Sequence, residues 1–158
     1  MNEIVIAPHE HWLFYGIPRE TLEPVLKAGH EARFLPGEAI FHEGDEANGL
    51  YLLTAGTARV AASGDNGETF LALVHANEVL GEMGVLDGEP RSGTATAVTM
   101  CVTFFIPSDP FLDLLETSTA VCMRLLALLT QRLRRANGRL GELPPSGIVS
   151  AEEAINEI

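Results

Sequence analysis

The spacing of apolar residues divides the chain into a helical segment, a long β-prone segment and a second helical segment. Between Pro18 and about His30, apolar side chains recur at helical spacing on one face. From Ala32 to Pro107, short apolar runs alternate with glycine-rich turns, and after Pro110 the helical period returns. Many short strands separated by glycine turns are typical of an antiparallel β roll, sandwich or barrel. The pattern therefore predicts a mainly β domain of one of these kinds, preceded and followed by helical segments.

The clearest turn in the β-prone segment is Asn66-Gly67, which separates the runs Tyr51–Ala62 and Thr69–Val74. An Asn-Gly pair readily adopts the positive φ angles of a two-residue hairpin turn. We therefore expect the two runs to pair as antiparallel neighbours.

Two helices are expected after the roll. Phe111–Glu116 predicts a short helix, and Ser118 or Thr119 can cap a long one that ends near Leu140. In the long helix, apolar residues recur at alternating spacings of four and three, which is the seam of a coiled coil. The seam residues are Cys122, Leu126, Leu129, Leu133, Ala136 and Leu140.

This seam is interpreted as a homodimer interface formed by the helix of residues 119–140. Leu125 and Leu128 lie off the seam and are expected to pack back onto the β region. The alternative is that one broad face of the helix is buried in the chain's own core.

The chain is accordingly divided into a leader (1–17), a domain that includes the long helix (18–141) and an acidic tail (142–158). The leader holds His9 and His11 and is expected to fray. The tail follows a proline-rich stop and is too short to form a stable helix unless it docks onto something.

Composition narrows the possible partners. The 158 residues suit one domain, and 10 basic against 22 acidic residues give a formal net charge of −12 at pH 7. That average field repels a polyanion such as DNA. No apolar stretch approaches 18 residues, so no membrane span is expected. The absence of a secretory signal, and two cysteines outside any CxxC pair, favour a cytoplasmic protein with reduced thiols.

The segment from residue 80 to residue 95 carries the most specific chemistry. Gly81 allows close approach of the backbone, and Glu82–Leu86 predicts one helical turn whose free N–H groups favour an anion. Arg91 offers a planar fork of donors suited to a phosphate, and Ser92 adds one more hydrogen bond. A carboxylate at position 82 is repelled by phosphate but can accept from a sugar hydroxyl. The cassette therefore suits a ligand with one phosphate charge and one ribose hydroxyl.

Two motifs together resemble the cyclic nucleotide-binding domains of the cyclic AMP receptor protein type. The first motif consists of Phe34, Pro36-Gly37-Glu38, Ile40-Phe41, Glu43-Gly44-Asp45, Leu50-Tyr51, Leu53, Gly56 and Val60. The second is Gly81-Glu82 followed by Arg91-Ser92, with the length of the family's phosphate-binding cassette. The resemblance covers the chain from about Leu22 to Leu140.

The resemblance implies an antiparallel β roll (jelly-roll-like) flanked by an N-terminal helix and two C-terminal helices. It also implies roles for individual residues. Arg91 and Ser92 would bind the cyclic phosphate, Glu82 the ribose 2′-hydroxyl, and the backbone at Gly81 would contribute. Arg132 is placed to pair with Glu82, and the long helix would cap the purine. The residues expected to bind ligand are Gly81, Glu82, Met83, Arg91, Ser92, Gly93, Arg132 and Asn137.

Two positions depart from the family pattern. Gly93 stands where the family usually has alanine, and Ala136 stands where receptor-type members offer a hydroxyl to the base. Asn137 can replace that hydroxyl, because its amide both donates and accepts. Adenine and guanine both remain open, with cyclic AMP expected ahead of cyclic GMP.

The expected function is a regulatory module without catalytic activity, cofactor or metal, which signals through its long helix to an unknown protein effector. Direct DNA binding is not expected, since the residues after Leu140 are acidic and leave no room for a recognition helix. A cupin-like metalloenzyme is the second class, but His42 and His75 stand alone, outside a ligand cluster. The third class is an interaction module that keeps the cassette in outline and binds no nucleotide.

Overall fold

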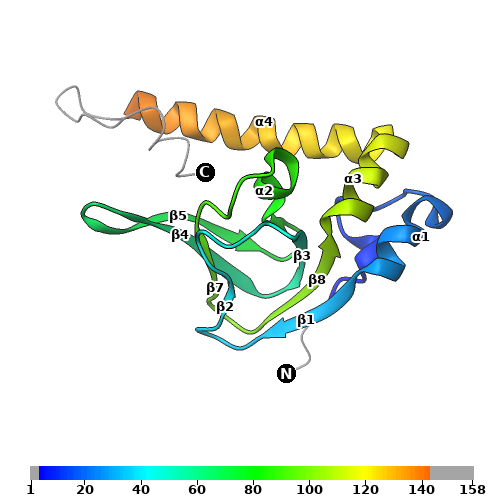
Figure 1. Ribbon diagram of the computed structural model, residues 1–158, viewed down its shortest axis with the longest axis horizontal. Coiled ribbons are helices and arrows are strands. Elements are labelled where there is room, and N and C mark those ends of the chain that lie inside the picture. The colour runs from blue at the N-terminus through cyan, green and yellow to red at the C-terminus, as the bar shows by residue number, and fades with distance from the viewer. Residues whose placement is uncertain (1–3, 143–158) are drawn as a thin grey trace.

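The computed structural model describes residues 4–142, without the side chains of residues 136 and 139–142. Within these residues the chain forms two four-stranded antiparallel sheets and four α-helices (Figure 1). The helices are α1 (Arg19–Ala28), α2 (Glu82–Asp87), α3 (Ser108–Thr117) and α4 (Thr119–Glu142), and one 3-10 turn, η1 (Pro8–Glu10), precedes them. The strands are β1 (His30–Phe34), β2 (Ala39–Phe41), β3 (Gly49–Ala55), β4 (Thr57–Gly64), β5 (Gly67–His75), β6 (Val79–Leu80), β7 (Thr94–Ala97) and β8 (Cys101–Pro107).

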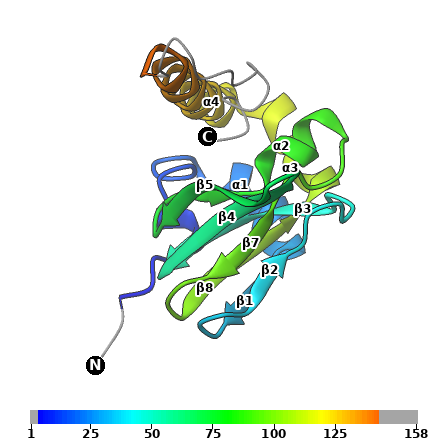
Figure 2. The ribbon, with the colours of Figure 1, turned by 90° about the vertical axis from the view of Figure 1, so that its left-hand side faces the viewer.

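The two sheets have the strand orders β1-β8-β3-β6 and β2-β7-β4-β5. They form a roll, with α1 and α3 beside the first sheet and α4 across the top in Figure 1. Figure 2 shows α4 nearly end-on above the strands. An antiparallel roll flanked by N-terminal and C-terminal helices confirms the predicted fold class.

The core has two parts, and the alternation of side chains along β3 connects them. Leu50 and Leu52 point toward α1, α3 and α4, where they meet helix residues such as Phe111. Leu53 points the other way, into the space between the two sheets, where it meets Ile40. Because successive strand residues face opposite sides, one strand serves both cores.

The predicted hairpin is present, since β4 and β5 pair in antiparallel register and Gly64 faces Gly67. The run Tyr51–Ala62, expected as one element, is divided at Gly56 into β3 and β4, which lie in different sheets. The apolar pattern continues across this break and therefore conceals it.

The long helix begins as predicted, with the Ser118 hydroxyl accepting a hydrogen bond of 3.2 Å from the Val121 N–H. Leu125 is buried and Leu128 packs against the same core, which confirms that these two residues face the body of the molecule. On the opposite side of α4, Leu126 is 51% exposed and Leu133 is 48% exposed.

The expectation that the segment before α1 is frayed is wrong for its described part. His11, Leu13 and Phe14 are fully buried. The His11 Nε2 lies 3.0 Å from the Glu78 carbonyl oxygen, and the Leu13 N–H donates to the His11 Nδ1 over 3.1 Å. These contacts fix His11 in its neutral form with the proton on Nε2, and they join the N-terminal segment to the turn between β5 and β6.

The acidic tail predicted for residues 142–158 lies outside the described residues, apart from Glu142 at the end of α4. In the described part of the chain, no helix combines the length and apolar character needed to cross a membrane.

Candidate functional site

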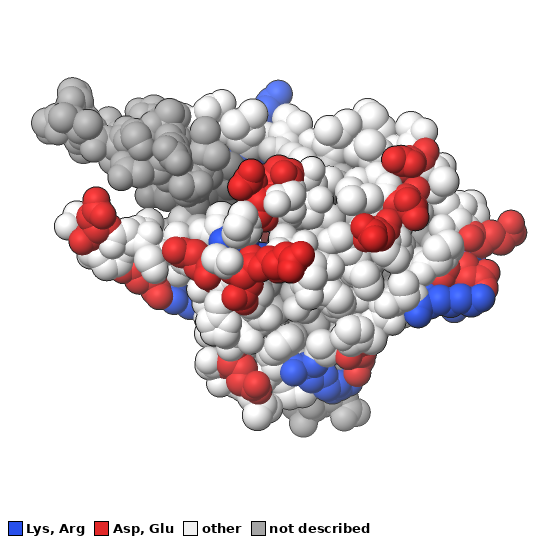
Figure 3. Space-filling model, viewed as in Figure 1, with Lys and Arg blue, Asp and Glu red and all other residues white. Residues whose placement is uncertain are grey.

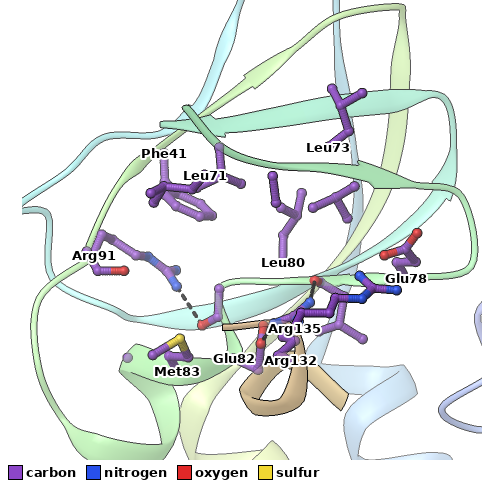
Figure 4. A pocket seen from close by; sticks show the side chains of 17 residues that line it. Phe41, Leu71, Leu73, Glu78, Leu80, Glu82, Met83, Arg91, Arg132 and Arg135 are labelled. Atoms are coloured by element: carbon purple, nitrogen blue, oxygen red, sulfur yellow. Dashed lines mark hydrogen bonds and ion pairs between the residues drawn. The ribbon is translucent and has the colours of Figure 1, made fainter. Parts of the chain in front are cut away.

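The site is built around Arg91, which lies in the loop between α2 and β7. The Arg91 N–H donates to the Asp45 carbonyl over 2.8 Å, and the Gly44 N–H donates to the Arg91 carbonyl over 2.9 Å. These paired hydrogen bonds fasten the loop to the connection between β2 and β3. The side chain consequently points inward and is only 5% exposed (Figure 4).

The Arg91 guanidinium is held by backbone and by one aromatic ring. Nη1 donates to the Gly81 carbonyl over 2.8 Å, and Nη2 donates to the Gly49 carbonyl over 2.6 Å. The guanidinium carbon lies 4.4 Å from the centre of the Phe41 ring, within the range of a cation–π contact. Nε is buried and has no hydrogen-bond partner among residues 4–142.

The charge of Arg91 is therefore not neutralised by its surroundings. None of the ion pairs found among the described residues includes Arg91. Burial lowers the pKa of Arg91, an effect opposed by Tyr51 and Asp45. A buried cation with a free donor is costly by itself and favours the entry of an anion.

Gly81 is required at its position for two reasons. Its φ of +81° is a left-handed conformation that residues with a side chain rarely adopt. A Cβ atom there would also lie 2.4 Å from Arg91 Nη1. Glycine thus permits both the turn into α2 and the contact between the Gly81 carbonyl and the guanidinium.

Glu82, the first residue of α2, forms an ion pair with Arg132 of α4. The Glu82 side chain is 2% exposed and the Arg132 side chain 16%. Arg132 Nη2 also donates to the Val79 carbonyl over 3.0 Å. Burial lowers the pKa of Arg132, while Glu78 raises it and Arg135 lowers it further. The pairing expected between Arg132 and Glu82 is confirmed.

A single pocket contains most of the predicted site residues (Figure 4). Gly81, Glu82, Met83, Arg91, Ser92 and Arg132 line it. The remaining lining residues come from β2, β4, β5, β6, α2 and α4 and from the β5–β6 turn: Phe41, Val60, Leu71, Ala72, Leu73, Val74, Glu78, Val79, Leu80, Gly84 and Arg135.

Two predicted residues are not among those that line the pocket. Asn137 is exposed on α4. Gly93 is buried against β4, where a Cβ atom would lie 2.9 Å from the Ala61 carbonyl oxygen. Gly93 therefore permits close packing of β4 on the cassette, and alanine there would require a local shift. The side chain of Ala136 lies outside the described residues.

Sequence reasoning missed Phe41, the β5 residues and Arg135 as parts of the pocket. Phe41 belongs to the motif shared with the family, but its spacing marks it only as an apolar strand residue. Leu71 and Leu73 belong to the run predicted as the second strand of the hairpin, and nothing in that pattern indicates a pocket. Arg135 follows Arg132 by three residues, so the two side chains lie on the same face of a helix. This spacing could have identified Arg135 as a second arginine of the pocket.

The pocket contrasts in charge with the surface around it. Its lining includes Arg91, Arg132 and Arg135 against Glu78 and Glu82. Figure 3 shows acidic side chains gathered around α2 on the face that it displays. No group of three or more histidine, cysteine or carboxylate side chains that could hold a metal occurs in the part of the chain that the structure describes.

Comparisons with known proteins agree with this geometry. The model of the cyclic nucleotide-binding domain family matches residues 31–118. The chain is 33% identical over 147 residues to the cyclic AMP receptor protein of Thermus thermophilus, which covers 92% of this chain and 65% of that protein. The chain spans about three fifths of the length of the curated relatives that it matches.

Solved structures show the same fold. The catabolite activator protein of Thermus thermophilus has a TM-score of 0.71 at 33% identity, over 82% of this chain and 61% of that chain. The sensor domain of the transcriptional regulator DNR from Pseudomonas aeruginosa has a TM-score of 0.70 at 23% identity, over 89% of this chain and 93% of that chain. The second likeness is one of fold alone.

Proposed function

Since this chain belongs to the cyclic nucleotide-binding domain family, we propose that it is a regulatory module that binds a cyclic nucleoside monophosphate in the pocket beside Arg91. The ligand would be bound and released unchanged, without a catalytic step. We propose that these 158 residues do not contact DNA themselves, because their net charge of −12 would repel it.

The observation that carries the proposal is the buried and unneutralised guanidinium of Arg91. A cyclic phosphate carries one negative charge, which would match the buried cation of Arg91, a residue in none of the ion pairs found among the described residues. The free Nε–H provides a donor, and an arginine side chain has further N–H groups beyond the two engaged by Gly81 and Gly49. Charge-assisted hydrogen bonds of this kind are about twice as strong as neutral ones.

The other predicted residues fit the rest of the ligand. Glu82 accepts hydrogen bonds only, so it would bind a ribose hydroxyl rather than a phosphate. Ser92, at the exposed edge of the pocket, would donate to a phosphate oxygen. The apolar side chains of Leu71 and Leu73 on β5 provide a surface for a purine ring.

Cyclic AMP is the proposed ligand, with cyclic GMP as the competing possibility. The relative from Thermus thermophilus is named a cyclic AMP receptor protein. Asn137 is exposed on α4, and we propose that it reaches the base only when the helix closes over the ligand.

Signalling would pass through α4 and a homodimer. Leu126 and Leu133 leave an apolar stripe on its outer side, and a second copy of the same helix would cover that stripe. Ligand binding would then shift an existing equilibrium between two positions of α4. The module would report this shift to a partner protein.

Thermal unfolding with cyclic AMP, cyclic GMP and linear 5′-AMP tests the proposal. Ligand at about 100 times its Kd should add roughly 2.7 kcal/mol of stability, or roughly 5 to 10 °C. Arg91→Leu should abolish the ligand-induced shift relative to its own unliganded transition. Arg33→Leu, which removes an exposed arginine of β1 from an ion pair with Glu31, should retain it. If millimolar cyclic nucleotide leaves the wild-type transition in place, the module acts by docking alone.

A further inference from the structure

Phe41 makes a cation–π contact with Arg91 that its position in the sequence does not predict. It is the last residue of β2, and its ring lies 4.4 Å from the Arg91 guanidinium carbon. Figure 4 shows both side chains on the wall of the same pocket. We propose that Phe41 is a positioning residue, which holds the plane of the Arg91 guanidinium in the orientation that binds the phosphate. This inference rests on the proposed function.

The need for such a residue follows from the contacts of Arg91. Its hydrogen bonds to the Gly81 and Gly49 carbonyls fix two nitrogens and leave Nε–H and further N–H groups for a phosphate. A phosphate bound to these groups would pull the guanidinium toward itself. The contact with the Phe41 ring uses no N–H group, so it would hold the plane of the guanidinium while the phosphate binds.

The ring of Phe41 is itself held by an aromatic column that runs through the roll. The Phe41 and Tyr51 ring centres are 6.0 Å apart at an interplanar angle of 30°. Tyr51 also contacts Phe105 at 5.0 Å and Phe34 at 6.3 Å. Burial raises the pKa of Tyr51, whereas Arg91 lowers it, consistent with a column that ends at a cation. The two strands β3 and β8 thus determine the place of a β2 side chain.

An aliphatic residue at position 41 would fill much of the volume without providing a π face. Phe41 pairs with Ala95 of β7 and packs on the core between the sheets, so its apolar contacts alone are those of an ordinary strand residue. A cation–π contact differs because it depends on the aromatic ring and on the charge above it. Removal of the ring should therefore weaken phosphate binding more than it weakens folding.

The test compares the affinity of four proteins for cyclic AMP and cyclic GMP by isothermal titration calorimetry, with the unliganded Tm of each. Phe41→Leu should bind roughly 5- to 30-fold more weakly than the wild type, the range expected for loss of a partly desolvated cation–π contact. Phe41→Tyr, which keeps the ring, should restore binding to within about 2-fold. Phe70→Leu is the matched control, because it removes a ring that lies 5.7 Å from the Arg59 guanidinium carbon, outside the pocket and the aromatic column; it should bind as the wild type does.

Each outcome separates the two proposals. Wild-type protein that binds neither nucleotide overturns the proposed function. Wild-type protein that binds, with Phe41→Leu at equal affinity, overturns the role of Phe41 alone. Failure of Phe41→Tyr to restore affinity assigns the effect to core packing and also overturns that role. Equal weakening by Phe41→Leu and Phe70→Leu shows that the contact with Arg91 is not special and overturns it too.

Discussion

Arg132 of α4 and Glu82 of α2 form a buried ion pair that joins the long C-terminal helix to the border of the pocket. The residue before Glu82 is Gly81, whose carbonyl accepts a hydrogen bond from Arg91. Adjacent residues are therefore held by two arginines, one from the proposed ligand site and one from α4. A shift of the Gly81 peptide would therefore also move Glu82 and, through the ion pair with Arg132, would change the position of α4.

Loss of this ion pair should destabilise the fold. Arg132→Leu leaves the Glu82 carboxylate buried without its cation, and breaking a buried pair typically costs about 3 to 5 kcal/mol. Urea unfolding should show a loss in this range, reduced by the exposed part of Arg132. Arg134→Leu, on the exposed side of the same helix, should change stability by less than about 0.5 kcal/mol.

The double variant Glu82→Gln with Arg132→Leu separates charge burial from lost packing. Removal of the stranded carboxylate should recover a large part of the stability lost in Arg132→Leu. A double variant that is no more stable than Arg132→Leu would show that the unpaired carboxylate of Glu82 does not destabilise the fold.

Gly81→Ala should damage both folding and ligand binding. Forcing a non-glycine residue into the left-handed region costs about 1 to 2 kcal/mol, and the new Cβ would lie 2.4 Å from Arg91 Nη1. Gly88→Ala is a close control, because Gly88 has a φ of +75° but no atom within 4 Å of a built Cβ. Urea unfolding should show that Gly81→Ala lowers the free energy of unfolding more than Gly88→Ala does, and the difference measures the cost of the contact with Arg91. Equal decreases in the two variants would mean that the guanidinium moves aside freely.

His11 should make stability depend on pH in the acid range. Burial lowers the pKa of His11 from 6.5 to about 4, against a smaller opposing effect of the hydrogen bond to Glu78. Above pH 6.5 the imidazole is neutral in both states and full stability is retained. As the pH falls from 6.5 toward 4, only the unfolded chain gains the proton, so roughly 3 kcal/mol of stability is lost.

The His11 contribution can be isolated with a neutral replacement. His11→Gln keeps a donor for the Glu78 carbonyl and has no proton to gain, so its free energy of unfolding should fall less between pH 7 and pH 4. His9→Gln serves as the control, since the His9 side chain is 42% exposed, and it should follow the wild-type profile. Parallel profiles for wild type and His11→Gln would contradict a buried neutral His11.

Local signals were sufficient to predict the roll and the cassette. Asn66-Gly67 identified the hairpin, and the spacing of Gly81-Glu82 and Arg91-Ser92 placed several pocket residues in one short segment. The partner of Glu82 lies 50 positions away, at Arg132, and was available only from the family resemblance.

Contacts that depend on distant segments were not predicted. Phe41 meets Arg91 because β2 and the loop after α2 converge in space, and an apolar strand residue gives no sign of that. The segment Trp12-Leu13-Phe14 has no helical or strand period, so its burial follows from contacts such as that of His11 with Glu78. Long-range packing of this kind has no counterpart in local spacing.

The exposed stripe of α4 gives the test of the proposed homodimer. Leu126→Glu places a charge on the stripe, and analytical ultracentrifugation should show the mass of one chain for this variant and of two for the wild type. Leu126 is preferable to Leu129, which also packs on the core. Ala127→Glu adds the same charge to an exposed position about 100° around the helix and should remain dimeric. One mass shared by all three proteins would exclude this face of α4 as the interface.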